Sequence, residues 1–383
     1  MRTIFINGKV MTPFEVLDDQ ALLIEDTFIS GIIPAHDVQP KEEDRVMDVG
    51  GNWIAPGYID IHVHGGDRAD TMDASQEAFD TISRFFARHG VTSFLYTTGT
   101  ASNEAIWAVI EAYLDYRPPQ DGAAPLGIHL EGPYLSEEKK GAQPAAFLRD
   151  PEPEQYRKWF DTGVVKLMTI APELPGALAC IQYGKERGVE FAAGHSVATY
   201  EQMQGAVDAG LNQATHTFNG MKPLHHREPG VVGAVLADPR IYAQIITDGV
   251  HVHPPVVKAL VNAKRKERTV LITDAIRAAG LGEGEYDLLG QKVTVADGEA
   301  RIASGSLAGS ILTMDEAVRN TMRFCDLPLQ DAVYMATYAP AESIHVQDQR
   351  GQLQPGASAD IVILSEDATV ESTFVEGRLV YQK

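Results

Sequence analysis

Eight short apolar segments alternate with helical patterns through the middle of the chain, and this alternation constrains the fold more than any other feature. Each segment reads as a buried strand, and most of the intervening stretches place apolar side chains on one helical face. Eight such units are typical of an α/β fold, the TIM-type (β/α)8 barrel. The strands are expected near residues 58–62, 91–97, 126–130, 164–170, 190–193, 213–215, 243–246 and 269–272.

Local signals support the helices between these strands. Residues 75–89 carry an apolar face and are followed by Gly90, which suits the end of a helix. Thr199 is expected to cap a helix that runs to Ala209. A doubly wound parallel sheet is the alternative fold, but its first strand–helix turn should carry GxGxxG, and the sequence after residues 58–62 does not.

Both ends of the chain differ from the middle. Short alternating strands, broken at Gly, Pro and Asp, fill residues 1–53 and return in residues 351–383. We therefore expect one small β-sandwich domain built from both termini and a barrel domain over residues 54–350. Within the barrel domain, residues 286–303 are expected to form an inserted hairpin with an Asp-Gly turn.

Composition limits the partners. The net charge of −21 disfavours binding to nucleic acid or to an anionic membrane surface. Cys180 and Cys325 cannot form a disulfide framework, as expected in a reducing compartment. We find neither a signal-peptide core nor a run of about 18 apolar residues. We therefore expect a cytoplasmic protein with no nucleic-acid or membrane partner.

Side chains that bind metals or transfer protons stand at the predicted strand ends. His62 and His64 form an HxH sequence at the end of the first strand, and alternation places both imidazoles on the same face of that strand. Because the carboxyl ends of barrel strands meet at one rim, six such side chains are expected to converge there. Imidazole and carboxylate groups suit a catalytic Zn²⁺ or another divalent transition ion. The six residues are His62, His64, Glu131, His195, His216 and Asp274.

Two other residues with ligand-type side chains, His129 and Lys166, are interpreted as structural. A lone histidine at a strand end more often makes a structural hydrogen bond, and His129 is interpreted in this way. Lys166 raises the alternative of a carbamylated lysine bridging two metals. Because the Glu131 carboxylate can fill that bridging position, Lys166 is also interpreted as structural.

Polar loops after later strands offer substrate contacts. The segment NGMKPLHHREPG carries Asn219, Gly220 and Arg227, and arginine suits bidentate phosphate recognition. His251 follows the seventh strand, and the GSLAGS turn at residues 305–310 could present backbone amides to a ligand. A solvated loop with scattered cations and a small polar turn are the structural alternatives.

The segments PGYIDIHVHG, HLEGPY, GHS, THTFNGMKPLHHREPG, DGVHVHP, LITDA and GSLAGS together resemble the N-acetylglucosamine-6-phosphate deacetylase family of the amidohydrolase superfamily. The resemblance runs from about Asn52 to PGASADIVIL near the C-terminus. It implies a hydrolase acting on linear amide C–N bonds, with an amino-sugar phosphate as substrate and a homodimeric assembly. The products would be glucosamine 6-phosphate and acetate, and a metal-bound hydroxide would be the nucleophile.

The resemblance also implies a role for each matching residue. Glu131, His195 and His216 would hold the principal metal, and His62 and His64 a second one. Asp274 would act as the general acid/base, and Arg227 would contact the phosphate, reaching across the dimer interface. The residues implied in substrate binding are Ala142, Gln143, Asn219, Gly220, Arg227, His251, Leu307, Ala308 and Gly309.

One position departs from the family pattern. Many members carry a histidine after the KGA segment that polarises the acetyl carbonyl, whereas this chain has Gln143. An amide can donate a hydrogen bond to an oxyanion but carries no charge. Part of this role is therefore expected to pass to the metal, with the second metal of the HxH pair as compensation.

Several alternatives stay open on the sequence. Zn²⁺ is the favoured divalent ion, with iron, cobalt or manganese as alternatives and one or two ions per subunit. The substrate could be the epimer N-acetylgalactosamine 6-phosphate, which differs at one hydroxyl. Another amidohydrolase activity, on a cyclic imide or a nucleobase, is disfavoured by the basic loop. A non-catalytic sugar-phosphate sensor is disfavoured because a sensor would not need Asp274 at its metal.

Overall fold

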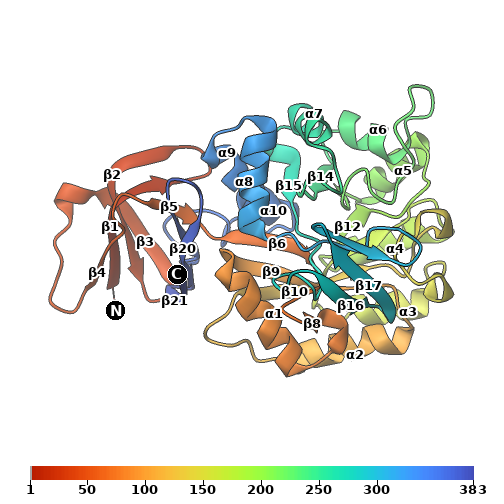
Figure 1. The fold of residues 1–383 in the computed structure, drawn as a ribbon, viewed down its shortest axis with the longest axis horizontal. Helices are drawn as coiled ribbons and strands as arrows, with labels where there is room; N and C mark the ends of the chain where they lie inside the picture. Colours follow the sequence, from red (N-terminus) through yellow and green to blue (C-terminus); the bar gives the residue numbers. More distant parts are fainter. Residues whose placement is uncertain (1) are drawn as a thin grey trace.

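The computed structural model describes residues 2–383; residue 1, the first of the predicted small β domain, lies outside the described residues. Eight parallel strands form a barrel, which confirms the predicted (β/α)8 architecture (Figure 1). Successive strands along the chain are neighbours in the sheet, so each strand–helix unit adds one strand. The strands are β6 (Tyr58–Val63), β9 (Val91–Thr98), β10 (Ala124–Glu131), β11 (Val165–Ile170), β12 (Glu190–Ala193), β13 (Gln213–Ala214), β14 (Tyr242–Ile245) and β15 (Thr269–Leu271).

The first and last strands of the barrel meet through a short contact rather than a full ladder. Val63 and Ala275 form a single parallel bridge. The backbone N–H of Asp274 donates to the carbonyl of His62 at 3.0 Å, and that of His64 donates to Ala275 at 2.9 Å. This seam brings the end of β6 beside the segment that follows β15, so residues far apart in sequence share one rim.

Helices cover the barrel where the apolar faces were expected. Helix α1 buries Phe79, Ile82 and Phe86 and begins at the Ser75 side chain, which accepts from the N–H of Ala78. Every helix within residues 2–383 is too short or too polar to cross a bilayer. The helices are α1 (Gln76–Arg88), α2 (Asn103–Asp115), α3 (Pro153–Phe160), α4 (Ala177–Lys185), α5 (Tyr200–Ala209), α6 (Gly230–Ala237), α7 (Pro254–Lys264), α8 (Met314–Cys325), α9 (Leu329–Ala336) and α10 (Tyr338–Ser343).

A second sheet combines strands from both ends of the chain, and both termini lie beside it (Figure 1). Its eight strands are joined in one hydrogen-bonded sheet around a separate apolar core. Phe5 and Phe374 meet edge to face across this core, with ring centroids 5.0 Å apart. The strands are β1 (Arg2–Met11), β2 (Val16–Glu25), β3 (Phe28–Pro34), β4 (Arg45–Asp48), β5 (Trp53–Pro56), β19 (Ile361–Leu364), β20 (Val370–Val375) and β21 (Arg378–Gln382).

A three-stranded antiparallel sheet follows β15, where the sequence indicated a two-stranded hairpin. It consists of β16 (Gly284–Leu288), β17 (Gln291–Ala296) and β18 (Glu299–Ile302), and we call it the inserted sheet. One face packs Val293, Val295 and other apolar side chains into a third core. The side chain of Gln291 donates to the carbonyl of Ala142 at 2.6 Å and so ties the sheet to a barrel loop. A two-stranded ribbon, β7 (Gly65–Gly66) and β8 (Ala69–Asp70), completes the strands within residues 2–383.

Candidate metal and substrate site

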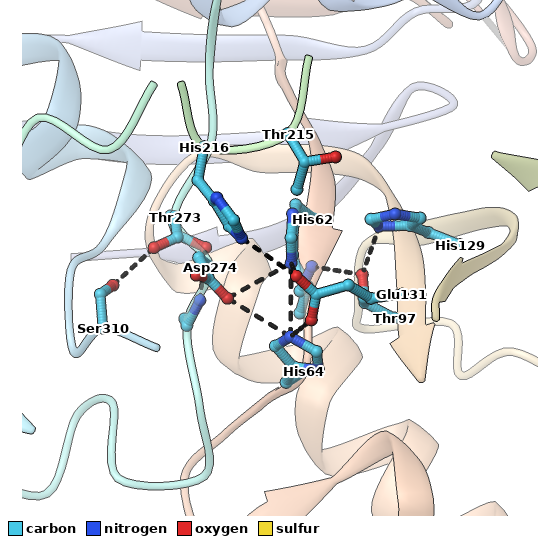
Figure 2. Close-up of polar contacts among 12 residues, drawn as sticks. His62, His64, Thr97, His129, Glu131, Thr215, His216, Thr273, Asp274 and Ser310 are labelled. Atoms are coloured by element: carbon cyan, nitrogen blue, oxygen red, sulfur yellow. Dashed lines mark hydrogen bonds and ion pairs between the residues drawn. The ribbon is translucent and has the colours of Figure 1, made fainter. Parts of the chain in front are cut away.

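The six predicted metal and acid–base residues converge at the carboxyl rim of the barrel. His62 lies in β6, Glu131 ends β10, and the other four follow their strands by one to three residues. The backbone turns sharply at three of these positions, because His195, His216 and Asp274 adopt φ values of 46°, 30° and 50°. Such left-handed residues are uncommon outside glycine and gather at functional sites. Figure 2 shows four of the six side chains grouped around Glu131: His62, His64, His216 and Asp274.

Glu131 is the centre of the cluster. Its Oε1 lies 3.1 Å from Nε2 of both His195 and His216. Its Oε2 lies 3.2 Å from Nε2 of His64. Two groups of three potential ligands therefore share this carboxylate, one with His62 and His64 and one with His195 and His216.

Asp274 faces the first of these groups. Its Oδ1 lies 3.3 Å from Nε2 of His62 and 3.3 Å from Nε2 of His64 (Figure 2). The peptide of Asp274 is held on both sides, since its carbonyl accepts from the N–H of Ser310 at 2.8 Å. Ser310 also donates through its hydroxyl to the carbonyl of Thr273. The carboxylate thus has a fixed direction at the edge of the ligand cluster.

The histidines are arranged as ligands for a cation. Nδ1 of His195 lies 2.8 Å from the carbonyl of Lys139, and Nδ1 of His216 lies 3.2 Å from that of Asn219. Because a carbonyl can only accept, each Nδ1 carries the proton and each Nε2 turns a lone pair inward. These two Nε2 atoms are 3.1 Å apart. Lone pairs that face each other this closely fit a positive ion held between them, so the residues present suit a divalent metal.

The pKa values of the cluster reflect its burial and its two carboxylates. Burial lowers the pKa of His62 to about 4, which favours the neutral imidazole that binds metals. Burial works in the same direction on His64 and His195, but the neighbouring carboxylates raise the pKa of both imidazoles overall. Burial works to raise the pKa of Glu131 and Asp274, but the surrounding imidazoles outweigh it and hold both below their usual values. Two ionised carboxylates in a buried site need a compensating positive charge, which a divalent ion supplies.

His129 and Lys166 make structural hydrogen bonds and are not part of the metal cluster. The His129 ring bridges the hydroxyls of Thr97 and Thr169 at 3.2 and 2.8 Å, and it packs edge to face on His62. The amine of Lys166 donates to the carbonyl of Gly163, at the opposite end of β11 from the metal cluster. Neither side chain joins the two ligand groups.

A cavity of about 330 Å³ opens over the cluster. Its lining includes seven of the nine residues expected to bind substrate. One of them, His251, is oriented by Asp248, whose carboxylate lies 2.6 Å from the Nδ1 of His251. Burial works to lower the pKa of His251, but the hydrogen bond and charge of Asp248 raise it overall. The seven residues are Ala142, Gln143, Asn219, Gly220, His251, Leu307 and Gly309.

The two remaining substrate-binding predictions lie outside this lining. Ala308 is fully buried in the core beneath the inserted sheet. Arg227 is exposed on its loop, with Nη1 2.7 Å from the ring of His226, so within one chain it does not line the cavity. Its expected contact across a dimer interface stays a prediction.

Gln143 lines the cavity but has both ends of its amide engaged. Its Nε2 donates to Oε2 of Glu131 at 2.6 Å, and its Oε1 accepts from the N–H of Thr100 at 2.8 Å. The side chain is 6% exposed. The donor expected to reach the acetyl carbonyl is therefore directed at the central carboxylate instead.

Sequence reasoning missed two charged residues of this site. Asp248 precedes His251 by three residues in the DGVHVHP segment, and that spacing could have identified it. Arg301 lines the cavity from β18 in the inserted sheet. Nothing in its local sequence distinguishes it from other surface arginines, because its position depends on how that sheet packs.

Comparisons with known proteins agree with this geometry. The sequence pattern of the amidohydrolase family matches residues 53–380. An N-acetylglucosamine-6-phosphate deacetylase from Lysinibacillus sphaericus is 42% identical over 88% of this chain and 87% of its own length. An N-acetylgalactosamine-6-phosphate deacetylase from Escherichia coli O157:H7 is 39% identical over 97% of each chain. A mutant N-acetyl-D-glucosamine-6-phosphate deacetylase from Mycobacterium smegmatis, solved with N-acetyl-D-glucosamine-6-phosphate, superposes with a TM-score of 0.91 at 33% identity, covering 100% of this chain and 99% of that one.

Proposed function

The chain belongs to the amidohydrolase family of hydrolases, which act on amide C–N bonds, and we propose that it removes the acetyl group from N-acetylglucosamine 6-phosphate. The products are glucosamine 6-phosphate and acetate. One observation carries the proposal: Asp274 lies 3.3 Å from two histidines of a buried ligand cluster that borders a cavity. We also propose a cytoplasmic homodimer.

The cluster would hold the metal that this chemistry needs. Glu131, His195 and His216 would bind a principal ion, and His62 and His64 would bind a second one that shares Glu131. Zn²⁺ suits these donors best, with iron, cobalt or manganese as alternatives. Such an ion lowers the pKa of a bound water towards about 7 and polarises the acetyl carbonyl.

Asp274 would serve as the general acid/base. Its carboxylate is accessible to the cavity and would accept a proton from the attacking water. It would then return that proton to the departing amine, since an amide nitrogen leaves poorly as an anion. The hydrogen bonds that fix the Asp274 peptide would hold its carboxylate at the same edge of the cluster in both steps.

The remaining cavity residues would orient the sugar phosphate. His251, held by Asp248, offers a directed imidazole, and Asn219 and Gly220 offer an amide and a backbone N–H. Binding energy from the phosphate end would hold the acetamide beside Asp274 without taking part in the reaction. Arg227 would add a contact from the partner subunit of the dimer.

N-acetylgalactosamine 6-phosphate is the second candidate substrate. The Escherichia coli relative that acts on it, according to its name, matches 97% of this chain, and an N-acetylglucosamine-6-phosphate deacetylase from Vibrio furnissii matches 95% of it, both at 39% identity. The two sugars differ at one hydroxyl, and both carry the acetamide and the phosphate that this mechanism uses.

The test is acetate release from four sugars on protein whose metal has been counted: both N-acetylhexosamine 6-phosphates and both unphosphorylated forms. We expect acetate release with the highest kcat/KM from N-acetylglucosamine 6-phosphate. Higher kcat/KM on the galactosamine epimer would favour the second candidate. Binding of either phosphate without acetate release would contradict a hydrolase and favour a sensor.

A further inference from the structure

One basic side chain with a permanent positive charge, Arg301, lines the cavity. Of the described residues, 2–383, Arg301 is the only arginine or lysine in the cavity lining. The protein carries 53 acidic and 32 basic residues, so a basic side chain at this place stands against the overall charge. Arginine presents a planar set of donors that matches a phosphate group.

Arg301 is attached to the loop that lines the same cavity. It pairs with Leu307 in an isolated antiparallel bridge, and its Nη1 donates to the carbonyl of Gly305 at 2.6 Å. The loop between these residues adds Ser306 to the lining. The guanidinium and the backbone amides of this loop thus form one edge of the cavity.

His251 lies within the electrostatic reach of Arg301. The positive charge of Arg301 is one of the influences that lower the pKa of His251, against the larger effect of Asp248. Both residues line the same cavity. Arg301 reaches it from the inserted sheet, and His251 from the segment after β14. A group with two negative charges placed between them would be favoured by both.

The present partner of Arg301 is weak enough to exchange. Its Nε donates to the Glu299 carboxylate at 2.6 Å, but the two side chains are 45% and 36% exposed. Exposed ion pairs contribute little, with a median of about 0–1 kcal/mol. A phosphate at this edge would compete with Glu299 for the same donors.

We propose that Arg301 binds the phosphate of the substrate from within the same chain and sets the preference for phosphorylated over unphosphorylated sugar. This inference rests on the proposed function. It assigns to the inserted sheet a recognition role that does not require Arg227 or a second subunit. Glu299 weakens phosphate binding, because its carboxylate accepts a hydrogen bond from the Arg301 guanidinium that the phosphate would otherwise accept.

The experiment compares kcat and KM of four variants on phosphorylated and unphosphorylated N-acetylglucosamine. We expect R301Q to raise KM for the phosphorylated sugar about 10- to 100-fold, the range for a lost hydrogen bond to a charged group, with kcat nearly unchanged. E299Q should lower that KM. R301K should recover part of the loss, because it restores the charge without the planar donors. K292Q is the matched control, since Lys292 lies on the same sheet, pairs with Glu285 and does not line the cavity.

Each result bears on one hypothesis. Equal KM values for R301Q and K292Q, or equal losses on both sugars, would overturn the role of Arg301 while leaving an active deacetylase. If the unaltered enzyme releases no acetate, the proposed function fails. Calorimetric binding of glucosamine 6-phosphate then tests separately whether Arg301 binds the phosphate. Weaker binding by R301Q would then support its role, and unchanged binding would overturn it.

Discussion

The amide of Gln143 spans two elements of the site at the scale of single residues. It joins the backbone after β9, at Thr100, to the carboxylate of Glu131 at the end of β10. Glu131 is shared by both ligand groups, so its orientation affects every metal bound there. Hydrogen bonds from such surrounding residues fix ligand direction and commonly account for 10- to 100-fold in metal affinity.

We therefore expect Q143L to weaken metal binding about 10- to 100-fold. The measurement is metal retained in competition with a chelator, followed directly by metal analysis. Q182L is the control, because Gln182 is exposed on α4 and has no part in the site. Unchanged metal affinity with a lower kcat would instead identify Gln143 as a contact to the acetyl carbonyl.

Asp274 permits a prediction that separates proton transfer from metal binding. D274N keeps the shape and the hydrogen bonds of the peptide but removes the group that accepts the proton. We expect the metal content to stay the same and kcat to fall about 10²- to 10⁴-fold, the usual range for a general acid or base. Near-normal turnover would exclude Asp274 from the mechanism, and loss of metal would make it a ligand.

At the scale of elements, α5 depends on a cap that the sequence already indicated. The Thr199 side chain accepts from the N–H of Gln202, and the Gln202 side chain accepts from the N–H of Thr199. This reciprocal pair satisfies two N–H groups at the start of the helix that would otherwise have no partner. The helix follows His195 by only a few residues, so its start also limits the movement of that loop.

We expect T199A to lower the free energy of unfolding by about 1 kcal/mol, the typical value for a lost N-cap. Denaturant unfolding followed by circular dichroism measures this difference. T199S should stay close to the original protein, because serine caps equally well. Equal loss in both variants would attribute the effect to the threonine methyl group rather than to the cap.

The inserted sheet shows where local patterns fail. Its first strand, β16, alternates intermediate and exposed residues and buries only Leu288. A segment with so little apolar content does not stand out as a strand in the sequence. The segment becomes a strand because it pairs with the edge of β17. The resulting sheet buries Val293, Ile302 and other apolar side chains on one face.

At the scale of the whole molecule, the metal would tie the barrel together. The ligands come from β6 and β10 and from the segments after β12 and β13, so one site joins strands across the barrel. Two ionised carboxylates and several inward lone pairs lie close together within it. An ion that binds only the folded chain stabilises it according to its concentration.

We expect removal of the metal by a chelator to lower Tm, with a loss of roughly 4 kcal/mol relative to protein at a metal concentration a thousandfold above Kd. Calorimetric scans before chelation, after chelation and after Zn²⁺ is added back measure the effect. The double variant H62N/H64N should lose less on chelation, since it keeps only the Glu131, His195 and His216 group. An unchanged Tm would argue against a resident metal.

The sequence by itself determined the barrel and the ligand cluster. Eight buried strands and capped helices are local properties, and parallel strands bring their carboxyl ends together, so His62, His195 and Asp274 could be placed on one rim from their strand positions alone. Only the tertiary structure decided that Gln143 contacts Glu131 and that Arg301 lines the cavity. Gln143 lies on a loop and Arg301 on the inserted sheet, and the packing of such segments depends on the surface they cover rather than on a repeating pattern.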